Sequence, residues 1–87
     1  MDTRQILGWN LRSLRVAKGM SQERLGLEAG IDRSYVGRVE RGSENVTLTR
    51  LESFAAVLGV TVAQLLTEPK SPSGNPPGLK AGRKPKT

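Results

Sequence analysis

The stretch from Ser21 to Gly42 constrains the fold of this chain more than any other, because it holds the start and stop signals of two short helices in succession. Ser21 and Asp32 are both favoured N-cap residues. Gly30 lies between them and suits the left-handed conformation that closes a helix, since glycine has no Cβ to clash. Only Ile31 separates Gly30 from the second cap, so the two helices must cross at a steep angle. The stretch therefore predicts a helix-turn-helix, with Gly42 ending its second helix.

The second of these helices has two unlike faces. Val36 and Val39 share one face, with Glu40 beside them. The other side carries arginines and small residues: Arg33, Ser34, Gly37, Arg38 and Arg41. Such a helix can pack inward and meet an anionic partner, although the charges alone would fit a solvated surface equally well. Together with the helix-turn-helix, the pattern favours DNA, because the second helix of this motif can lie in a major groove.

The segment resembles the Cro and lambda-repressor-type (XRE-type) helix-turn-helix family. The resemblance runs from about Leu7 to Leu66 and rests on the following residues: Arg15, Gly19-Met20-Ser21-Gln22, Leu25, Ala29-Gly30, Ser34, Tyr35, Val36, Val39-Glu40-Arg41-Gly42, Leu48, Leu51, Ala55, Leu58-Gly59-Val60 and Leu65-Leu66. It implies an all-α fold, a compact bundle of about five short helices of the lambda-repressor-like type. Within the family, three runs also resemble small restriction–modification controller proteins: Asp32-Arg33-Ser34-Tyr35, Glu40-Arg41-Gly42 and Asn45-Val46-Thr47.

The composition argues against several kinds of function. The 87 residues fit one small domain with a modest core. The chain has no cysteine and no histidine, which removes disulfides, the usual general base and the commonest metal ligand. There is also no glycine-rich phosphate loop of the right spacing. We therefore expect no enzyme, no metal and no cofactor, and the sequence indicates no small-molecule effector.

The sequence also lacks membrane and export signals. No apolar run approaches the ~20 residues that a membrane span needs. The N-terminus does not have the basic and then apolar layout of a signal peptide. We expect a cytoplasmic protein without a membrane partner.

The positive charge of the chain is concentrated at its C-terminal end. The whole chain has a formal net charge of +6, and residues 69–87 supply five of these charges with no acid among them. This segment is rich in proline and glycine, so we expect a disordered tail that either adds non-specific DNA affinity or only aids solubility. Residues 1–68, the expected helix-turn-helix domain, have nine basic and eight acidic residues. A DNA-binding face there must therefore be a local patch.

Helical signals flank the motif on both sides. Residues 2–18 predict a first helix with three leucines that should face the core: Leu7, Leu11 and Leu14. Thr47 is the expected N-cap of a later helix, and Thr61 begins a last short helix with a capping box. The later helix has an expected inward stripe of Leu48, Leu51, Ala55 and Leu58. The family resemblance implies one further contact, a partly buried ion pair between Arg15 and Glu40.

The residues expected to contact DNA fall into two groups. We expect base-edge contacts from Arg33, Ser34 and Arg38, because an arginine can donate two hydrogen bonds to guanine. Tyr35 could stack on a base or sugar or touch a thymine methyl group. The resemblance implies that Gln22 contacts a phosphate or a base edge. Phosphate contacts, which set register without reading sequence, are expected from Arg41, Ser43, Asn45, Thr47, Arg50 and Arg12.

Four apolar residues near the end of the expected domain have two possible roles. Phe54, Val57, Val62 and Leu66 could form an exposed patch that joins two copies, as the resemblance implies, or they could complete a small core. For the chain as a whole we predict a sequence-specific, double-stranded DNA-binding transcriptional regulator. It would act as a homodimer on a near-palindromic operator, with the recognition helix around Arg33–Arg41 in the major groove. A protein-interaction module on the same fold is the alternative, but the arginine stripe argues against it as the sole role.

Overall fold

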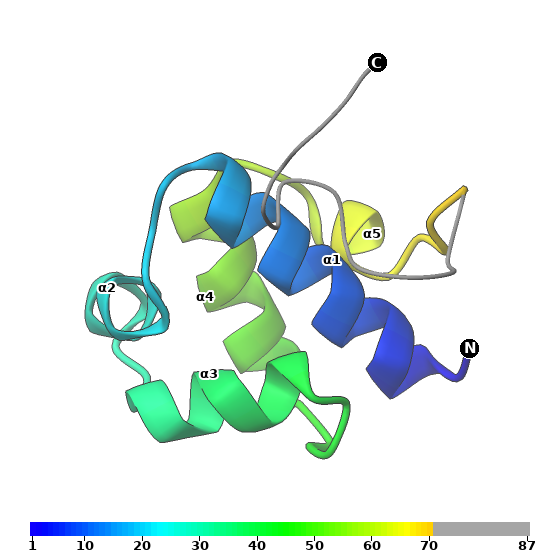
Figure 1. Ribbon diagram of the computed structural model, residues 1–87, viewed down its shortest axis with the longest axis horizontal. Helices are drawn as coiled ribbons and strands as arrows, with labels where there is room; N and C mark the ends of the chain where they lie inside the picture. The colour runs from blue at the N-terminus through cyan, green and yellow to red at the C-terminus, as the bar shows by residue number, and fades with distance from the viewer. Residues whose placement is uncertain (71–87) are drawn as a thin grey trace.

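The computed structural model describes residues 1–70 as five helices joined by short loops, with no strand in this part of the chain (Figure 1). The helices are α1 (Thr3–Ala17), α2 (Gln22–Ala29), α3 (Arg33–Glu40), α4 (Leu48–Leu58) and α5 (Val62–Leu65). The expected all-α bundle of five short helices is confirmed. The predicted tail, residues 69–87, lies outside the described residues except for Pro69 and Lys70. No helix among the described residues has the length and apolar character required to cross a bilayer.

Polar caps fix where each helix begins. The four predicted N-caps each accept a hydrogen bond from a backbone N–H of the first turn: Ser21, Asp32, Thr47 and Thr61. Asp2 does the same for α1 and forms a capping box with Gln5. Gly30 and Gly59 end α2 and α4 in the left-handed conformation, each with a φ of 71°. These local signals set the helix lengths and the tight α2–α3 turn.

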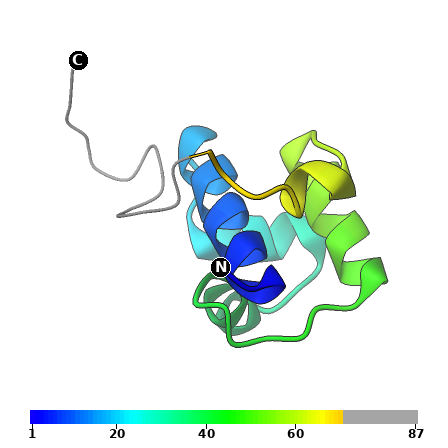
Figure 2. The same ribbon diagram turned by 90° about the vertical axis from the view of Figure 1, so that its right-hand side faces the viewer.

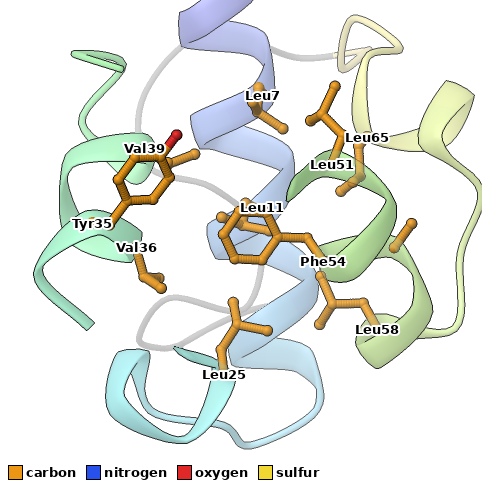
Figure 3. Close-up of a cluster of buried hydrophobic side chains, with 11 residues drawn as sticks. Leu7, Leu11, Leu25, Tyr35, Val36, Val39, Leu51, Phe54, Leu58 and Leu65 are labelled. Atoms are coloured by element: carbon orange, nitrogen blue, oxygen red, sulfur yellow. The ribbon is translucent and has the colours of Figure 1, made fainter. Parts of the chain in front are cut away.

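The core lies where the five helices meet. Figure 1 places α2 and α5 on opposite sides of α1 and α4, with α3 below them. In Figure 2 α5 lies beside α4 and close to α1. Figure 3 shows side chains from every helix converging on one cluster: Leu7, Leu11, Leu25, Tyr35, Val36, Val39, Leu51, Phe54, Ala55, Leu58 and Leu65. Leu14, predicted to face the core, packs partly buried against it.

One prediction for α4 is wrong, that Leu48 faces inward, and the structure decides between the two roles left open for Phe54. Phe54 is 0% exposed and points toward Leu11 in the middle of the core (Figure 3). It therefore cannot belong to an exposed patch. Leu48, expected to face inward, is 74% exposed. Both follow from how the other helices pack on α4: the side that they cover includes Phe54, whereas Leu48 lies on the other side of the stripe, in the first turn at the edge of the core.

An asparagine of α1 adds hydrogen bonds to the end of α5. The Asn10 side-chain Nδ2 donates hydrogen bonds to the carbonyl oxygens of Leu65 and Thr67, each at 2.8 Å. These carbonyls lie at the end of α5, where the helix itself provides no donors. The amide therefore closes a helix of only four residues from outside. Nothing in the spacing of the sequence indicated this contact, because its partners lie more than fifty residues apart.

Candidate nucleic-acid interface

The α2–α3 turn is packed more closely than a side chain would allow. A Cβ placed on Gly26 would lie 2.4 Å from the carbonyl oxygen of Ile31, a backbone atom that cannot swing away. The start of α3 at Arg33 is also in tight contact, with its backbone nitrogen 3.3 Å from the same point. Even alanine would therefore clash at this position.

The Glu40 carboxylate connects three helices. Arg15 donates from Nε to Glu40 Oε2 at 2.6 Å and from Nη2 to Oε1 at 3.0 Å. The Arg15 and Glu40 side chains are only 11% and 2% exposed, so the expected, partly buried ion pair is present. Gln22 Nε2 also donates to Glu40 Oε1, at 2.9 Å, and Arg15 Nη1 donates to the Met20 carbonyl at 2.7 Å. One carboxylate thus fixes α1, α2 and α3 relative to one another.

An open groove of about 590 Å³ lies between α2 and α3 on the outer face of the pair. We call it the α2–α3 groove, and it is lined by Arg15, Ser21, Gln22, Glu23, Arg33, Ser34, Gly37, Arg38 and Arg41. It brings together four of the five residues predicted to read bases, and Arg41 from the predicted phosphate group. Gln22, which lines the groove from α2, is held in position by its hydrogen bond to Glu40.

Gly37 forms the floor of this groove. A Cβ on Gly37 would lie 3.3 Å from Arg41 Nη1 and 3.4 Å from Gln22 Oε1. Both atoms are ends of flexible side chains, so they can move aside. The missing side chain therefore lets Arg41 and Gln22 lie across the middle of α3.

Tyr35 is the predicted DNA contact that the structure relocates. It is 9% exposed and belongs to the core. The guanidinium carbon of Arg50 lies 4.4 Å from the centre of its ring, and that of Arg38 lies 5.5 Å away. The ring is covered by the core and by Arg50, which leaves little of its face for the predicted stacking on a base. Its position follows from helical spacing, since Tyr35 is one turn before Val39 on the buried side of α3. Tyr35 instead orients two arginines by cation–π contact.

The loop after α3 and the start of α4 carry four of the predicted phosphate contacts. The Ser43 hydroxyl donates to the Arg38 carbonyl at 3.0 Å, and Asn45 is exposed. The Thr47 hydroxyl accepts a hydrogen bond from the Arg50 backbone N–H at 3.2 Å. Arg50 is exposed, and its guanidinium lies over the Tyr35 ring. Ser43 and Asn45 follow the C-terminal end of α3, whereas Arg50 lies over Tyr35 in the first half of the same helix. Arg12 differs: it does not line the groove, and its buried Nε has no hydrogen-bond partner among the described residues.

Three acids lie close to the arginines of this face. Glu44 pairs with Arg38 at 2.6 Å, and Glu23 lies 3.7 Å from Arg33. Asp32, the α3 N-cap, accepts hydrogen bonds from the hydroxyl and the backbone N–H of Ser34. The hydroxyl contact is the main reason why the pKa of Asp32 is lowered. Residues 1–70 contain no group of three potential metal ligands.

Known proteins share this sequence and this geometry. The family described as Helix-turn-helix matches residues 11–65. A hypothetical transcription factor of Neisseria meningitidis is 48% identical over 79% of this chain, which spans 65% of that protein's length. Control protein C.SmaI of Serratia marcescens is 45% identical over 77% of this chain and 80% of its own length. The crystal structure of the restriction–modification controller protein C.AhdI from Aeromonas hydrophila is also similar, with a TM-score of 0.69 and 47% identity over 71% of this chain and 94% of that one. The chain therefore belongs to the XRE-type helix-turn-helix family of DNA-binding transcription regulators, and not to a family of enzymes.

Proposed function

We propose that this chain is a sequence-specific transcriptional regulator that places α3 in the major groove of double-stranded DNA. The observation that carries the proposal is the α2–α3 groove, where Arg33, Arg38 and Arg41 gather on one exposed face of α3. Arg33 and Arg38 are the proposed base readers, because a guanidinium can donate two parallel hydrogen bonds to guanine O6 and N7. Ser34 and Gln22 line the same groove, and we propose that they contact neighbouring base edges or a phosphate.

Phosphate contacts on both sides of α3 would set its depth and angle in the groove. Arg41, Ser43, Asn45, Thr47 and Arg50 are the proposed donors on one side. On the other side, the start of α2 at Ser21 presents backbone N–H groups and the positive end of the helix dipole. Arg12 is retained only as an outlying candidate, since its Nε is buried.

We propose further that the regulator acts as a homodimer. One recognition helix covers only a few base pairs, so a two-fold pair on a near-palindromic operator, with half-site centres ~34 Å apart, gives adequate selectivity. Val57, Val62 and Leu66 form the proposed association surface, since all three pack against the core yet remain partly exposed. An apolar patch satisfies the self-complementarity of a two-fold axis without matched charges.

The relatives favour a narrower assignment, which we also propose. C.SmaI is named as a control protein and C.AhdI as a restriction–modification controller protein. Both are more than 40% identical to this chain and align over most of their own length. We infer a cytoplasmic controller of the same kind. The assignment predicts genes for a methyltransferase and an endonuclease beside the gene of this protein, and their absence would remove this narrower function only.

Selection of bound sequences from a random pool of duplex DNA tests the proposed function. The wild-type chain should select a motif of two inverted half-sites. Arg33→Ala and Arg38→Ala should each relax one position in each half-site and cost about 1–3 kcal/mol there. Asn45→Ala is the control, because Asn45 is exposed and loss of a phosphate contact should weaken all sequences alike. If both α3 variants select an unchanged motif, α3 is not the reading helix.

A further inference from the structure

Glu44 stands in a fixed position beside a proposed base reader. Arg38 Nε donates to Glu44 Oε2 at 2.6 Å, across the loop that follows α3. This loop is tied back to the helix, because the backbone N–H and the hydroxyl of Ser43 both donate to the Arg38 carbonyl at 3.0 Å. The Gly42 N–H also donates to the Val39 carbonyl at 3.0 Å. The carboxylate therefore cannot follow Arg38 freely; it holds the arginine in place.

Arg38 is also restricted on its other side. The ring of Tyr35 lies 5.5 Å from the Arg38 guanidinium carbon, and Tyr35 is itself fixed by burial and by Arg50. Within residues 1–70, the hydrogen bonds of the Arg38 guanidinium involve Nε alone. The two Nη groups, which form the outer edge of the guanidinium, therefore keep their donors for a ligand. This outer edge can still donate two parallel hydrogen bonds.

We propose that Glu44 is a positioning residue that determines specificity: it holds Arg38 through Nε and so directs its Nη edge at a guanine. The inference rests on the proposed function. A held arginine loses less side-chain freedom on binding and swings less readily to a phosphate. The carboxylate also offsets a positive charge that would attract any duplex. Glu44 should therefore raise discrimination between bases while lowering affinity for non-specific DNA.

The second acid–arginine pair of the same face provides a matched control. Glu23 lies 3.7 Å from Arg33, and the two side chains are 74% and 70% exposed. A pair so long and so exposed is screened by solvent and holds neither side chain. Removing Glu23 changes the charge of the face as much as removing Glu44 does. Only the loss of Glu44 should disturb the orientation of an arginine.

The test compares Glu44→Ala, Glu44→Gln and Glu23→Ala with the wild-type chain. Each protein is titrated with the selected site, with the same site altered at the position that Arg38→Ala relaxes, and with a non-specific duplex. Glu44→Ala should reduce discrimination at that position about tenfold and strengthen non-specific binding. Glu44→Gln can still accept from Nε, so it should keep more discrimination than Glu44→Ala. Glu23→Ala should leave discrimination within about twofold. Circular dichroism on melting checks that all variants are folded.

Three results would overturn the inference. Glu44→Ala could strengthen binding to every duplex equally, which would show that Glu44 only repels phosphates. Glu23→Ala could lose discrimination to the same extent, which would show a general charge effect. Arg38→Ala could relax one base position while Glu44→Ala leaves it intact, which would refute the role of Glu44 but keep the proposed function. A wild-type chain that selects no motif would instead refute the proposed function itself.

Discussion

Two regions of the molecule are held in place by different kinds of contact. We call them the α2–α3 corner, residues 21–42, and the α4–α5 end, residues 57–66. In the corner, positions are fixed by directed bonds and backbone contact: the Glu40 carboxylate accepts from Arg15 and Gln22, and Gly26 leaves room for no side chain. At the other end, α4 and α5 are held mainly by apolar side chains, with Asn10 as the one polar clamp described above.

This difference corresponds to two different tasks. A helix that reads bases must be held within a narrow range of positions, and directed bonds provide that precision. A surface that pairs with a second copy needs partly exposed apolar area, which Val57, Val62 and Leu66 retain. We therefore expect changes at the α4–α5 end to affect association, and changes in the corner to affect the geometry and stability of a single chain.

The largest expected effect tests the α4–α5 end. Val57→Glu should give a folded monomer. The new carboxylate would lie at the partly exposed edge of the core, in a 560 Å³ hollow that Lys18, Arg24 and Glu28 also line, and it would put a charge on the proposed association surface. Loss of the second half-site contact should weaken operator binding by roughly a hundredfold or more. Sedimentation gives the assembly state, circular dichroism gives the folded content, and titration with the selected operator gives the affinity.

Leu48→Glu is the control for this variant. Leu48 is an equally apolar and more exposed residue of the same helix, but it lies at the opposite end of α4. It should leave the dimer intact. A chain that stays dimeric as Val57→Glu but becomes monomeric as Leu48→Glu would move the interface to the start of α4. A wild type that is monomeric both free and on DNA would remove the interface altogether.

An effect of intermediate size is expected at two glycines of the α2–α3 corner, Gly26 and Gly37. Gly26→Ala and Gly37→Ala gain the same helix propensity, about 1 kcal/mol. Gly26→Ala should nevertheless lower the free energy of unfolding by about 1–3 kcal/mol, because its Cβ would meet the Ile31 carbonyl oxygen at 2.4 Å. Gly37→Ala should be neutral or stabilising, since it meets only the movable ends of Arg41 and Gln22. Urea unfolding of both variants measures the difference. Equal stabilities would show that the turn can relax and that directed contact does not set its geometry.

The corner was also the part of the fold that the sequence predicted best. Caps and stop signals such as Ser21, Gly30 and Asp32 act within one helical turn, so they are visible in the local sequence. The Arg15–Glu40 pair joins distant residues and was expected only because the chain resembles a known family.

Burial was harder to predict, because it depends on how each helix is rotated against the others. Phe54 and Leu48 lie on the two sides of the same stripe of α4, and only the surrounding helices decide which one is covered. Tyr35 is buried partly because Arg50, from another helix, lies on its ring. The Arg38–Glu44 pair had no signal in the spacing, since it depends on the path of the loop after α3.

The smallest expected effect concerns the cap that begins α3. The pKa of Asp32 is lowered first by the hydrogen bond from the Ser34 hydroxyl and then by the Ser34 backbone N–H. A carboxyl with a lowered folded-state pKa stabilises the fold at pH values above its unfolded pKa of about 3.9, and this stabilisation is lost as pH falls through the folded value. Asp32→Asn keeps a good N-cap but cannot titrate. Melting temperatures of the two proteins should therefore differ by a constant amount above about pH 5 and converge in more acidic solution. Ser34→Ala removes the hydrogen bond from the Ser34 hydroxyl to Asp32. When Asp32→Asn is added to a chain with Ser34→Ala, the two melting temperatures should therefore converge by a smaller amount and over a narrower pH range. The difference in melting temperature between wild type and Asp32→Asn could instead stay constant down to acid pH. That result would show that the charge on Asp32 does not stabilise the start of the recognition helix, and that the cap acts through its neutral hydrogen bonds alone.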